Sequence, residues 1–359
     1  MARLDSFLRL VLEQKASDLH FSAGDTPTIR HDGDLVRLPF RQLSDAEARR
    51  FLIEILDDEK RAEFNEKGDL DFVYHLPGYG RFRANYFEQA RGMSGVFRII
   101  PNSRPTLDDL GMPPATRELT SHNNGLILVT GPTGAGKTTT LAALVNEINQ
   151  NSPRHIITVE DPIEFIHTPA QSVVTQRQVG LHVESFSTAL RSALREAPDV
   201  LVVGEMRDVE TMMLALQAAE TGVLVFGTLH TNSAATAVDR IMDAVPEGSR
   251  EQVRGILSVL LRGVIAQHLI KRASGEGRIA AVEVLLQSYA VSHLIREDKI
   301  HQLDALLQST DLEGSGMVSL DTCLLNYLHK GLVTVHDAVR VAKDPEWLRE
   351  QAAMIPDED

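Results

Sequence analysis

The run GPTGAGKTTT at residues 131–140 lies directly between an apolar segment, LILVT, and an amphipathic one, LAALVNEIN. It fits the pattern G-x-x-x-x-G-K-[S/T], in which glycines let backbone N–H groups surround phosphate oxygens while the lysine reaches the β- and γ-phosphates. A strand before the loop and a helix after it are the context that this motif requires. We therefore predict a nucleoside triphosphate site, with Thr138 able to bind magnesium. The predicted binding residues are Gly131, Pro132, Thr133, Gly134, Ala135, Gly136, Lys137, Thr138 and Thr139.

Short apolar segments alternate with helical ones around this motif. The four segments are LILVTG, HIITVED, VLVVGE and VLVFGTLH. Such alternation predicts a mostly parallel sheet that is covered by helices on both faces. We expect an α/β domain at residues 119–285 and a helical C-terminal region at residues 286–359.

The first hundred residues show a different pattern. An amphipathic helix is followed by alternating apolar and polar residues that Gly and Asp-Gly interrupt, as in antiparallel hairpins. This predicts a smaller α+β domain at residues 1–100. The segment PNSRPTLDDLGMPP then holds four prolines within fourteen residues, which predicts a linker or hinge at residues 101–118.

Charge and cysteine content limit the possible functions. The chain of 359 residues has 36 Lys plus Arg against 50 Asp plus Glu, a formal charge of −14, which disfavours a protein that coats nucleic acid. The single cysteine, Cys323, excludes an intrachain disulfide and a zinc site made of cysteines, and fits a reducing compartment. No apolar run approaches the roughly 20 residues of a membrane span. We expect a cytoplasmic protein that reaches a membrane only through a partner.

Two acidic segments follow predicted strands. The segment DVLVVGEMRD has Gly204 and then Glu205 where a P-loop hydrolase commonly carries an aspartate for magnesium. The segment TVEDPIEF carries Glu160, Asp161 and Glu164 within five residues. Strand ends of an open α/β sheet meet at one crevice, and hydrolysis needs a carboxylate that orients or deprotonates water. Alone this cluster would be a solvated loop, but beside a P-loop we predict that it acts in hydrolysis.

The segment VLVFGTLHT ends another predicted strand with Thr228, His230 and Thr231. These polar groups are able to sense a γ-phosphate. A lone histidine is more often structural, and no second histidine lies at a spacing typical of metal ligands.

The combination of motifs resembles one family. In this order, GPTGAGKT, TVEDPIEF, ALRSALREAPDVLVVGEMRD and ETGVLVFGTLHTNSA resemble the secretion ATPase superfamily, and within it the type IV pilus retraction ATPases of the PilT type. ASDLHFSAG, GRFRAN and VFRIIP resemble the N-terminal domain of that family, and HLIREDK resembles its C-terminal helical motif. The resemblance covers nearly the whole chain.

The resemblance implies a homohexamer in which a PAS-like N-terminal domain is joined to a RecA-like ATPase domain. ATP and Mg²⁺ would bind at the subunit interfaces. Hydrolysis would drive domain rotation and pass mechanical work to an inner-membrane platform protein, and so indirectly to pilin, which is depolymerised. The protein would lie in the cytoplasm at the inner face of the membrane, without direct contact with nucleic acid.

The resemblance also assigns roles to individual residues. Glu205 matches the Walker B acid, which would bind magnesium together with Thr138. Glu164 matches the glutamate that activates water, in the same acidic box as Glu160, and His230 matches the retained histidine of the His box.

Three arginines match a further feature of the family. Arg83 and Arg98 correspond to N-terminal arginines that reach the nucleotide of a neighbouring subunit, and Arg81 is a nearby third candidate. Such an arginine neutralises phosphoryl charge only when two subunits close. Taken from the residues alone, all three are ordinary surface positions of strands.

The chain departs from the family pattern at four positions. Val223 stands where a histidine is common, and Ala197 where an acid is common. In the C-terminal motif, Ser292 and His293 stand where the family has arginine and asparagine. The chain therefore also fits an accessory retraction paralogue.

Three further classes of protein share parts of this pattern. A pilus-extension or type II secretion ATPase commonly carries an additional N-terminal domain and a four-cysteine metal element. A nucleic-acid translocase is disfavoured by the acidic balance and by the lack of a basic stretch with interleaved aromatic residues. A nucleotide-regulated scaffold is disfavoured by the retention of Lys137, Thr138, Glu164 and Glu205.

Overall fold

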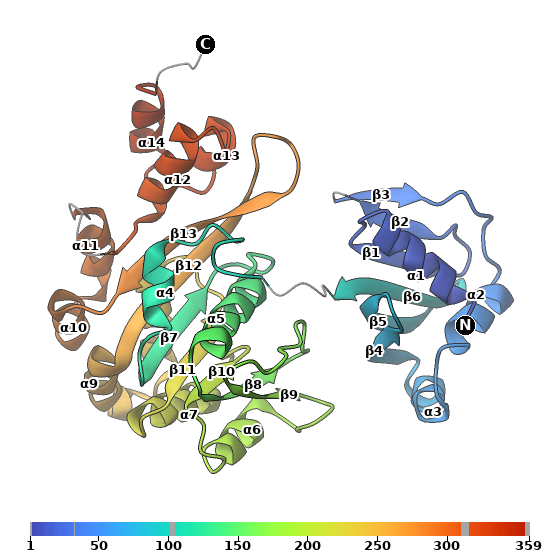
Figure 1. Ribbon diagram of the computed structural model, residues 1–359, viewed down its shortest axis with the longest axis horizontal. Coiled ribbons are helices and arrows are strands. Elements are labelled where there is room, and N and C mark those ends of the chain that lie inside the picture. The colour runs from blue at the N-terminus through green and yellow to red at the C-terminus, as the bar shows by residue number, and fades with distance from the viewer. Residues whose placement is uncertain (1, 32, 101–104, 310–315, 356–359) are drawn as a thin grey trace. The chain divides into compact units, whose positions relative to one another are not determined.

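The computed structural model describes residues 2–31, 33–100, 105–309 and 316–355 (Figure 1). The chain divides into two compact units, Met1–Ser103 and Arg104–Asp359. Each unit has a hydrophobic core of its own.

Unit 1 is built on a six-stranded antiparallel sheet with the strand order β3-β2-β1-β6-β5-β4. One face of this sheet carries Leu19, Phe82 and Phe97, which are buried in one cluster with Leu8 and Leu52 from two of the helices. The helices therefore cover that face. The elements are α1 Leu4–Glu13, β1 Asp18–Ser22, β2 Thr28–His31, β3 Asp34–Arg37, α2 Asp45–Ile53, α3 Asp58–Lys67, β4 Asp69–Leu76, β5 Gly80–Gln89 and β6 Gly92–Ile100.

Unit 2 is built on a seven-stranded sheet with the order β13-β12-β7-β11-β10-β8-β9, in which only the β12–β13 pair is antiparallel. Its strands are β7 Gly125–Thr130, β8 His155–Glu160, β9 Val173–Gln178, β10 Val200–Val203, β11 Leu224–Leu229, β12 Leu261–Lys271 and β13 Arg278–Leu286. Its α-helices are α4 Pro114–Leu119, α5 Lys137–Asn151, α6 Phe186–Ala193, α7 Val209–Glu220, α8 Ala234–Ala244, α9 Arg250–Leu260, α10 Tyr289–Arg296, α11 Leu303–Ser309, α12 Leu320–His329, α13 Val335–Val339 and α14 Pro345–Ala352.

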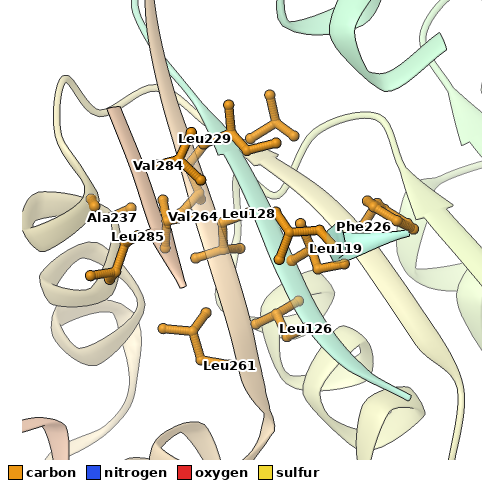
Figure 2. Close-up of a cluster of buried hydrophobic side chains, with 14 of the residues drawn as sticks. Leu119, Leu126, Leu128, Phe226, Leu229, Ala237, Leu261, Val264, Val284 and Leu285 are labelled. Atoms are coloured by element: carbon orange, nitrogen blue, oxygen red, sulfur yellow. The ribbon is translucent and has the colours of Figure 1, made fainter. Parts of the chain in front are cut away.

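Every residue of β7, β10 and β11 is buried. This pattern is typical of central strands that helices cover on both faces, and it confirms the α/β class expected from the sequence. Figure 2 shows the centre of this core, where Leu128 of β7, Phe226 of β11 and Val264 of β12 lie together with Leu119 of α4. The core thus joins the strand before the P-loop to its neighbours on both sides.

The core also includes segments that the sequence patterns did not place in it. Leu107 and Ala115 belong to the stretch 101–118 that was expected to be a linker, and both are buried in the core of unit 2. Residues 101–104 of that stretch lie outside the described residues. Strands β9, β12 and β13 extend the four predicted strands to seven.

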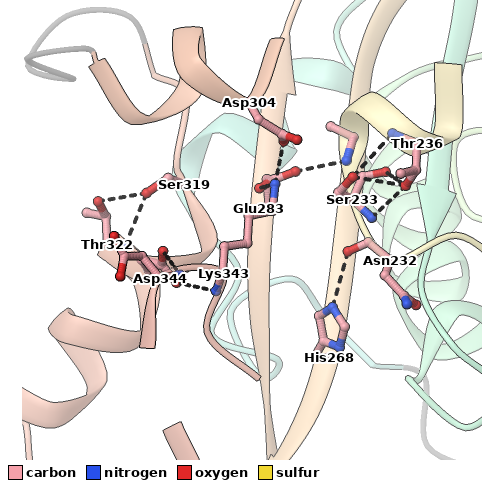
Figure 3. Close-up of polar contacts among 12 residues, drawn as sticks. Asn232, Ser233, Thr236, His268, Glu283, Asp304, Ser319, Thr322, Lys343 and Asp344 are labelled. Atoms are coloured by element: carbon pink, nitrogen blue, oxygen red, sulfur yellow. Dashed lines mark hydrogen bonds and ion pairs between the residues drawn. The ribbon is translucent and has the colours of Figure 1, made fainter. Parts of the chain in front are cut away.

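A polar junction joins the C-terminal helices to the sheet of unit 2 (Figure 3). The Glu283 side chain on β13 is 2% exposed, and its Oε2 lies 2.6 Å from Nζ of Lys343, which follows α13. The other oxygen, Oε1, accepts a hydrogen bond of 2.8 Å from the backbone N–H of Ala234 at the start of α8. Lys343 also pairs with Asp304 at 2.6 Å. A single buried carboxylate therefore connects α8, the sheet and the tail.

Replacing Lys343 with methionine removes the cation and leaves Glu283 buried. Breaking a buried pair from one side costs about 3–5 kcal/mol, because the remaining charge loses its compensation. We therefore expect Lys343→Met to lower the free energy of unfolding by about that amount in urea titrations.

Lys330→Met, at an exposed position of the same region, is the matched control and should change the free energy by less than about 0.5 kcal/mol. Adding Glu283→Gln to Lys343→Met should recover part of the loss, since position 283 then carries no buried charge. Equal losses for Lys343→Met and Lys330→Met would show that the buried pair does not hold the tail.

Candidate active site

The predicted P-loop connects β7 to α5. Three of its residues, Gly131, Gly134 and Gly136, have positive φ angles of 150°, 80° and 87°, which favour glycine. At Gly131 a Cβ atom would also lie 2.3 Å from the backbone carbonyl oxygen of Gln267. Because α5 starts at Lys137, the free N–H groups and the positive end of the helix dipole face the same loop. The positive φ angles of its glycines and the helix start behind it are features typical of phosphate-binding loops.

Lys137 begins a chain of polar contacts beside the loop. Its Nζ donates to the backbone carbonyls of Gly131 at 2.8 Å and Pro132 at 3.1 Å, and lies 3.4 Å from Nδ1 of His230. The other ring nitrogen, Nε2, lies 2.9 Å from Oε1 of Glu205. Since the ammonium group can only donate, Nδ1 is the acceptor in this arrangement, and Nε2 is the nitrogen that donates to Glu205. Burial lowers the pKa of Lys137, and the Glu205 carboxylate acts in the opposite direction.

Glu205 is held by a residue that the sequence analysis did not single out. Arg207 forms a bidentate ion pair with the carboxylate of Glu205. Its Nε lies 2.6 Å from Oε1, and a terminal nitrogen donates to Oε2 at 2.7 Å. Partial burial raises the pKa of Glu205, but the hydrogen bond and charge of Arg207, together with the hydrogen bond from His230, leave this pKa below its ordinary value. Glu205 is therefore an anion at neutral pH. The cation two positions after the acid, in GEMRD, was the available sequence signal.

The absence of an aspartate at position 204 has a steric reason. A Cβ atom there would lie 3.0 Å from the carbonyl oxygen of Val159 and 3.2 Å from Cα of Glu160, both on the neighbouring strand β8. These are backbone atoms that cannot turn away. Glycine therefore lets β10 lie close to β8, and the first carboxylate after β10 is that of Glu205.

Glu160 ends β8 and lies in the acidic box. Its Oε1 accepts hydrogen bonds from Oγ1 of Thr158 at 2.6 Å and Nε2 of Gln176 at 3.1 Å. Burial raises the pKa of Glu160; those two bonds oppose the shift, and the charge of Glu164 adds to it. The backbone N–H of Glu164 also bonds to the Glu160 carboxylate. Glu160 thus fixes the turn that carries Glu164, while Asp161 is exposed.

The two threonines of the His box bond to protein groups in this structure. The Thr228 hydroxyl donates to the carbonyl of Gly204, and the Thr231 hydroxyl lies 2.6 Å from that of Thr130. They join β11 to its two neighbours, and of these three residues His230 is the one that hydrogen-bonds to the Lys137 and Glu205 side chains.

Val223 is buried directly before the first residue of β11. At about 3.3 Å per residue, it lies roughly 20 Å from the end of β11 that leads to His230. The departure at position 223 therefore lies away from the P-loop.

The residues expected to bind magnesium have suitable donors. Thr138 follows Lys137 at the start of α5, and the Glu205 carboxylate is ionised. Among the described residues, no group of three or more His, Cys, Asp or Glu side chains is arranged to hold a metal ion. A hydroxyl and one carboxylate fit an ion that retains several waters and takes its remaining ligands from phosphates.

The three predicted arginines share one face of the unit 1 sheet. Arg83 lies directly opposite Arg98 in the register of β5 and β6, and Arg81 is two residues along β5 on the same side. Asp18, opposite both Arg98 and Arg30, is 4% exposed and accepts a bond of 2.8 Å from Nε of Arg98. The helices cover the other face, so these arginines lie on the helix-free face of the sheet.

Comparisons with known proteins agree with this geometry. The family described as type II/IV secretion system protein matches residues 2–322. The chain belongs to that family. Within it, the type IV pilus retractation ATPase PilT of Pseudomonas aeruginosa is 46% identical over 344 residues, which are 96% of this chain and 99% of that protein. The type IV pilus ATPase PilU of the same organism is 37% identical over 96% of this chain and 90% of its own length.

A solved structure supports the same assignment for the fold. The crystal structure of the pilus retraction motor PilT with bound ADP has a TM-score of 0.89 and 41% identity, and covers 98% of this chain and 100% of that one. Family membership confirms the resemblance seen in the sequence motifs. In the part of the chain that the structure describes, no helix is both long enough and apolar enough to cross a membrane.

Glu160→Gln should separate stability from activity. When folding raises the pKa of a carboxyl group, that group has no effect on stability at a pH below its pKa in the unfolded chain. As the pH rises from that pKa to the higher pKa of the folded state, the group destabilises the fold increasingly. Glutamine keeps an oxygen for Thr158 and Gln176 and carries no charge. We therefore expect Glu160→Gln to unfold at higher urea concentration than the wild type at pH 8, with the difference shrinking toward pH 4.5, and to hydrolyse ATP more slowly.

Glu220→Gln, at the exposed last residue of α7, is the control for removing one negative charge. A stability difference for Glu160→Gln that does not change between pH 4.5 and pH 8 would contradict the assigned pKa shift.

Proposed function

We propose that this protein is the motor ATPase of type IV pilus retraction, a homohexamer that converts ATP hydrolysis into pilin depolymerisation. One observation carries the proposal: a P-loop lysine, a histidine and a strand-end glutamate are in contact, in a chain 46% identical to PilT over nearly the full length of both proteins. The higher identity to PilT than to PilU supports the retraction motor over an accessory paralogue.

Binding of ATP would use the loop from Gly131 to Thr139. The backbone N–H groups would hold the phosphates and Lys137 would transfer its donors from loop carbonyls to phosphate oxygens, which its position permits. Magnesium, when bound to Thr138, Glu205 and the phosphates, would neutralise the charge that develops during transfer. The contact between His230 and Lys137 would make the His box sensitive to where the lysine lies.

Hydrolysis requires a group that orients or deprotonates water. Glu164 suits this role because its backbone is held by Glu160 through the bond described above. Glu160 suits a supporting role, since its own carboxylate is engaged by Thr158 and Gln176. Glu164 would therefore act on water, and Glu160 would position it.

Completion of the site would come from another subunit. Arg81, Arg83 and Arg98 lie together on a sheet face without helices, and Asp18 fixes the direction of Arg98. Arginines held in this way are suited to stabilise phosphoryl charge in trans. Rotation of the domains in the ring would then follow the order in which sites fill and empty.

The motor would act from the cytoplasm at the inner face of the cytoplasmic membrane. An inner-membrane platform protein of the pilus would receive the mechanical work and pass it to pilin. The excess of acidic side chains, 50 against 36 basic ones, supports a protein partner over nucleic acid.

A pilus-retraction assay tests the proposal. A strain that lacks its own retraction ATPase and makes this chain should regain retraction, whereas one that makes Lys137→Ala should not, because phosphates would lose their cation. Glu164→Gln should bind ATP with normal affinity, hydrolyse it at least about tenfold more slowly and fail to restore retraction.

Asp161→Asn, at the exposed acid of the same box, is the control for removing a carboxylate near the site. Ordinary ATP turnover by purified Glu164→Gln would remove that residue from its role. Full ATP turnover by the wild-type chain without retraction, when the chain is as abundant as the native ATPase, would contradict the retraction motor.

A further inference from the structure

A buried glutamine on β12 forms a hydrogen bond with the P-loop. Gln267 is 1% exposed, and its side-chain Nε2 donates to the carbonyl oxygen of Ala135 in the loop. Its Oε1 accepts a hydrogen bond of 2.7 Å from Oγ1 of Thr140 in α5. One amide therefore connects the sheet, the loop and the helix that follows it.

The orientation of this amide is fixed by its partners. The Ala135 carbonyl can only accept, so the nitrogen of Gln267 must face the loop. Its oxygen must then face Thr140, whose hydroxyl supplies the proton. An amide turned by 180° would place two oxygens against each other, so Thr140 stabilises the one orientation that serves the loop.

The bond to Ala135 also determines where the next N–H group points. A peptide unit is planar and trans, so the carbonyl of Ala135 and the N–H of Gly136 point in opposite directions. With the carbonyl held toward β12, the N–H of Gly136 is directed away from β12, to the side where the loop takes up phosphate. A Cβ atom on Gly136 would lie 3.1 Å from Nε2 of Gln267, so the amide packs directly beneath this peptide.

We propose that Gln267 is a positioning residue for the nucleotide, which acts by holding the Ala135–Gly136 peptide with its N–H directed at the phosphates. The proposal rests on the proposed function, because it requires that the loop binds a nucleotide. It assigns Thr140 a supporting role, since Thr140 holds the Gln267 amide in place.

A purely structural role predicts a different result. Gln267 also contributes backbone pairing in β12 and a carbonyl oxygen that lies against Gly131, and a change of side chain leaves both intact. If the amide only filled space, its loss would change stability without changing affinity. Affinity and stability therefore have to be measured on the same variants.

The test uses Gln267→Met in the full-length protein, because methionine keeps the length of the side chain and removes both hydrogen bonds. With ADP as the probe, we expect the Kd to rise about tenfold, the change that about 1.4 kcal/mol produces. The KM for ATP should rise by a similar factor, while kcat at saturating ATP stays within about twofold, because the nucleotide itself can hold the peptide once bound.

Ile265→Val, a buried change two residues earlier on β12, is the control for lost packing and should lower the Tm without changing the Kd. Thr140→Val should raise the Kd by less than Gln267→Met does, and should add less than about twofold in the Gln267→Met background. A lower Tm with an unchanged Kd for ADP in Gln267→Met would overturn the inference. Failure of the wild-type protein to bind ADP would instead overturn the proposed function.

Discussion

The site depends on one constraint on the backbone. The N–H groups of the P-loop must all point toward the place where phosphate would bind. Three residues of this loop are glycines, which can adopt many other conformations, so the loop requires supports on more than one side. Here β7 supplies its start, Thr130 bonds to Thr231 beyond β11, and Gln267 of β12 holds the Ala135 carbonyl. The parallel pairing of β7 with both neighbours brings those supports to the same sheet edge. The buried core therefore maintains the geometry of the phosphate site.

Four polar side chains form a row of contacts beside the loop. Lys137, His230, Glu205 and Arg207 follow one another within hydrogen-bond distance. In such a row, a change in the position of the lysine alters the partner available to the histidine and, through it, to the glutamate. Through these contacts, phosphate binding next to Lys137 can change the positions of the side chains that follow β10 and β11. Farther out, α8 begins at a backbone N–H that bonds to buried Glu283, which pairs with Lys343 of the tail.

Local patterns predicted much of this fold and missed its long-range parts. The P-loop, the four strands around it and the acids at their ends were predictable because each motif lies within about ten residues. Strand β12 starts directly after α9 at Leu260, without a turn residue between them, so no local signal separates the two. Gln267 and Ala135 are 132 residues apart in the chain, and only the register of the sheet brings them together. Arg207 was missed because an arginine after a strand is ordinarily a solvated side chain.

The most direct test of the proposed motor is ATP turnover per chain, measured over a dilution series together with the sedimentation of the same samples. If arginines of one subunit complete the site of another, turnover per chain must fall as rings dissociate, while the affinity of each P-loop for ADP stays the same. Arg98→Ala should lower turnover only at concentrations where rings form. Full turnover per chain by dissociated subunits would contradict a shared active site.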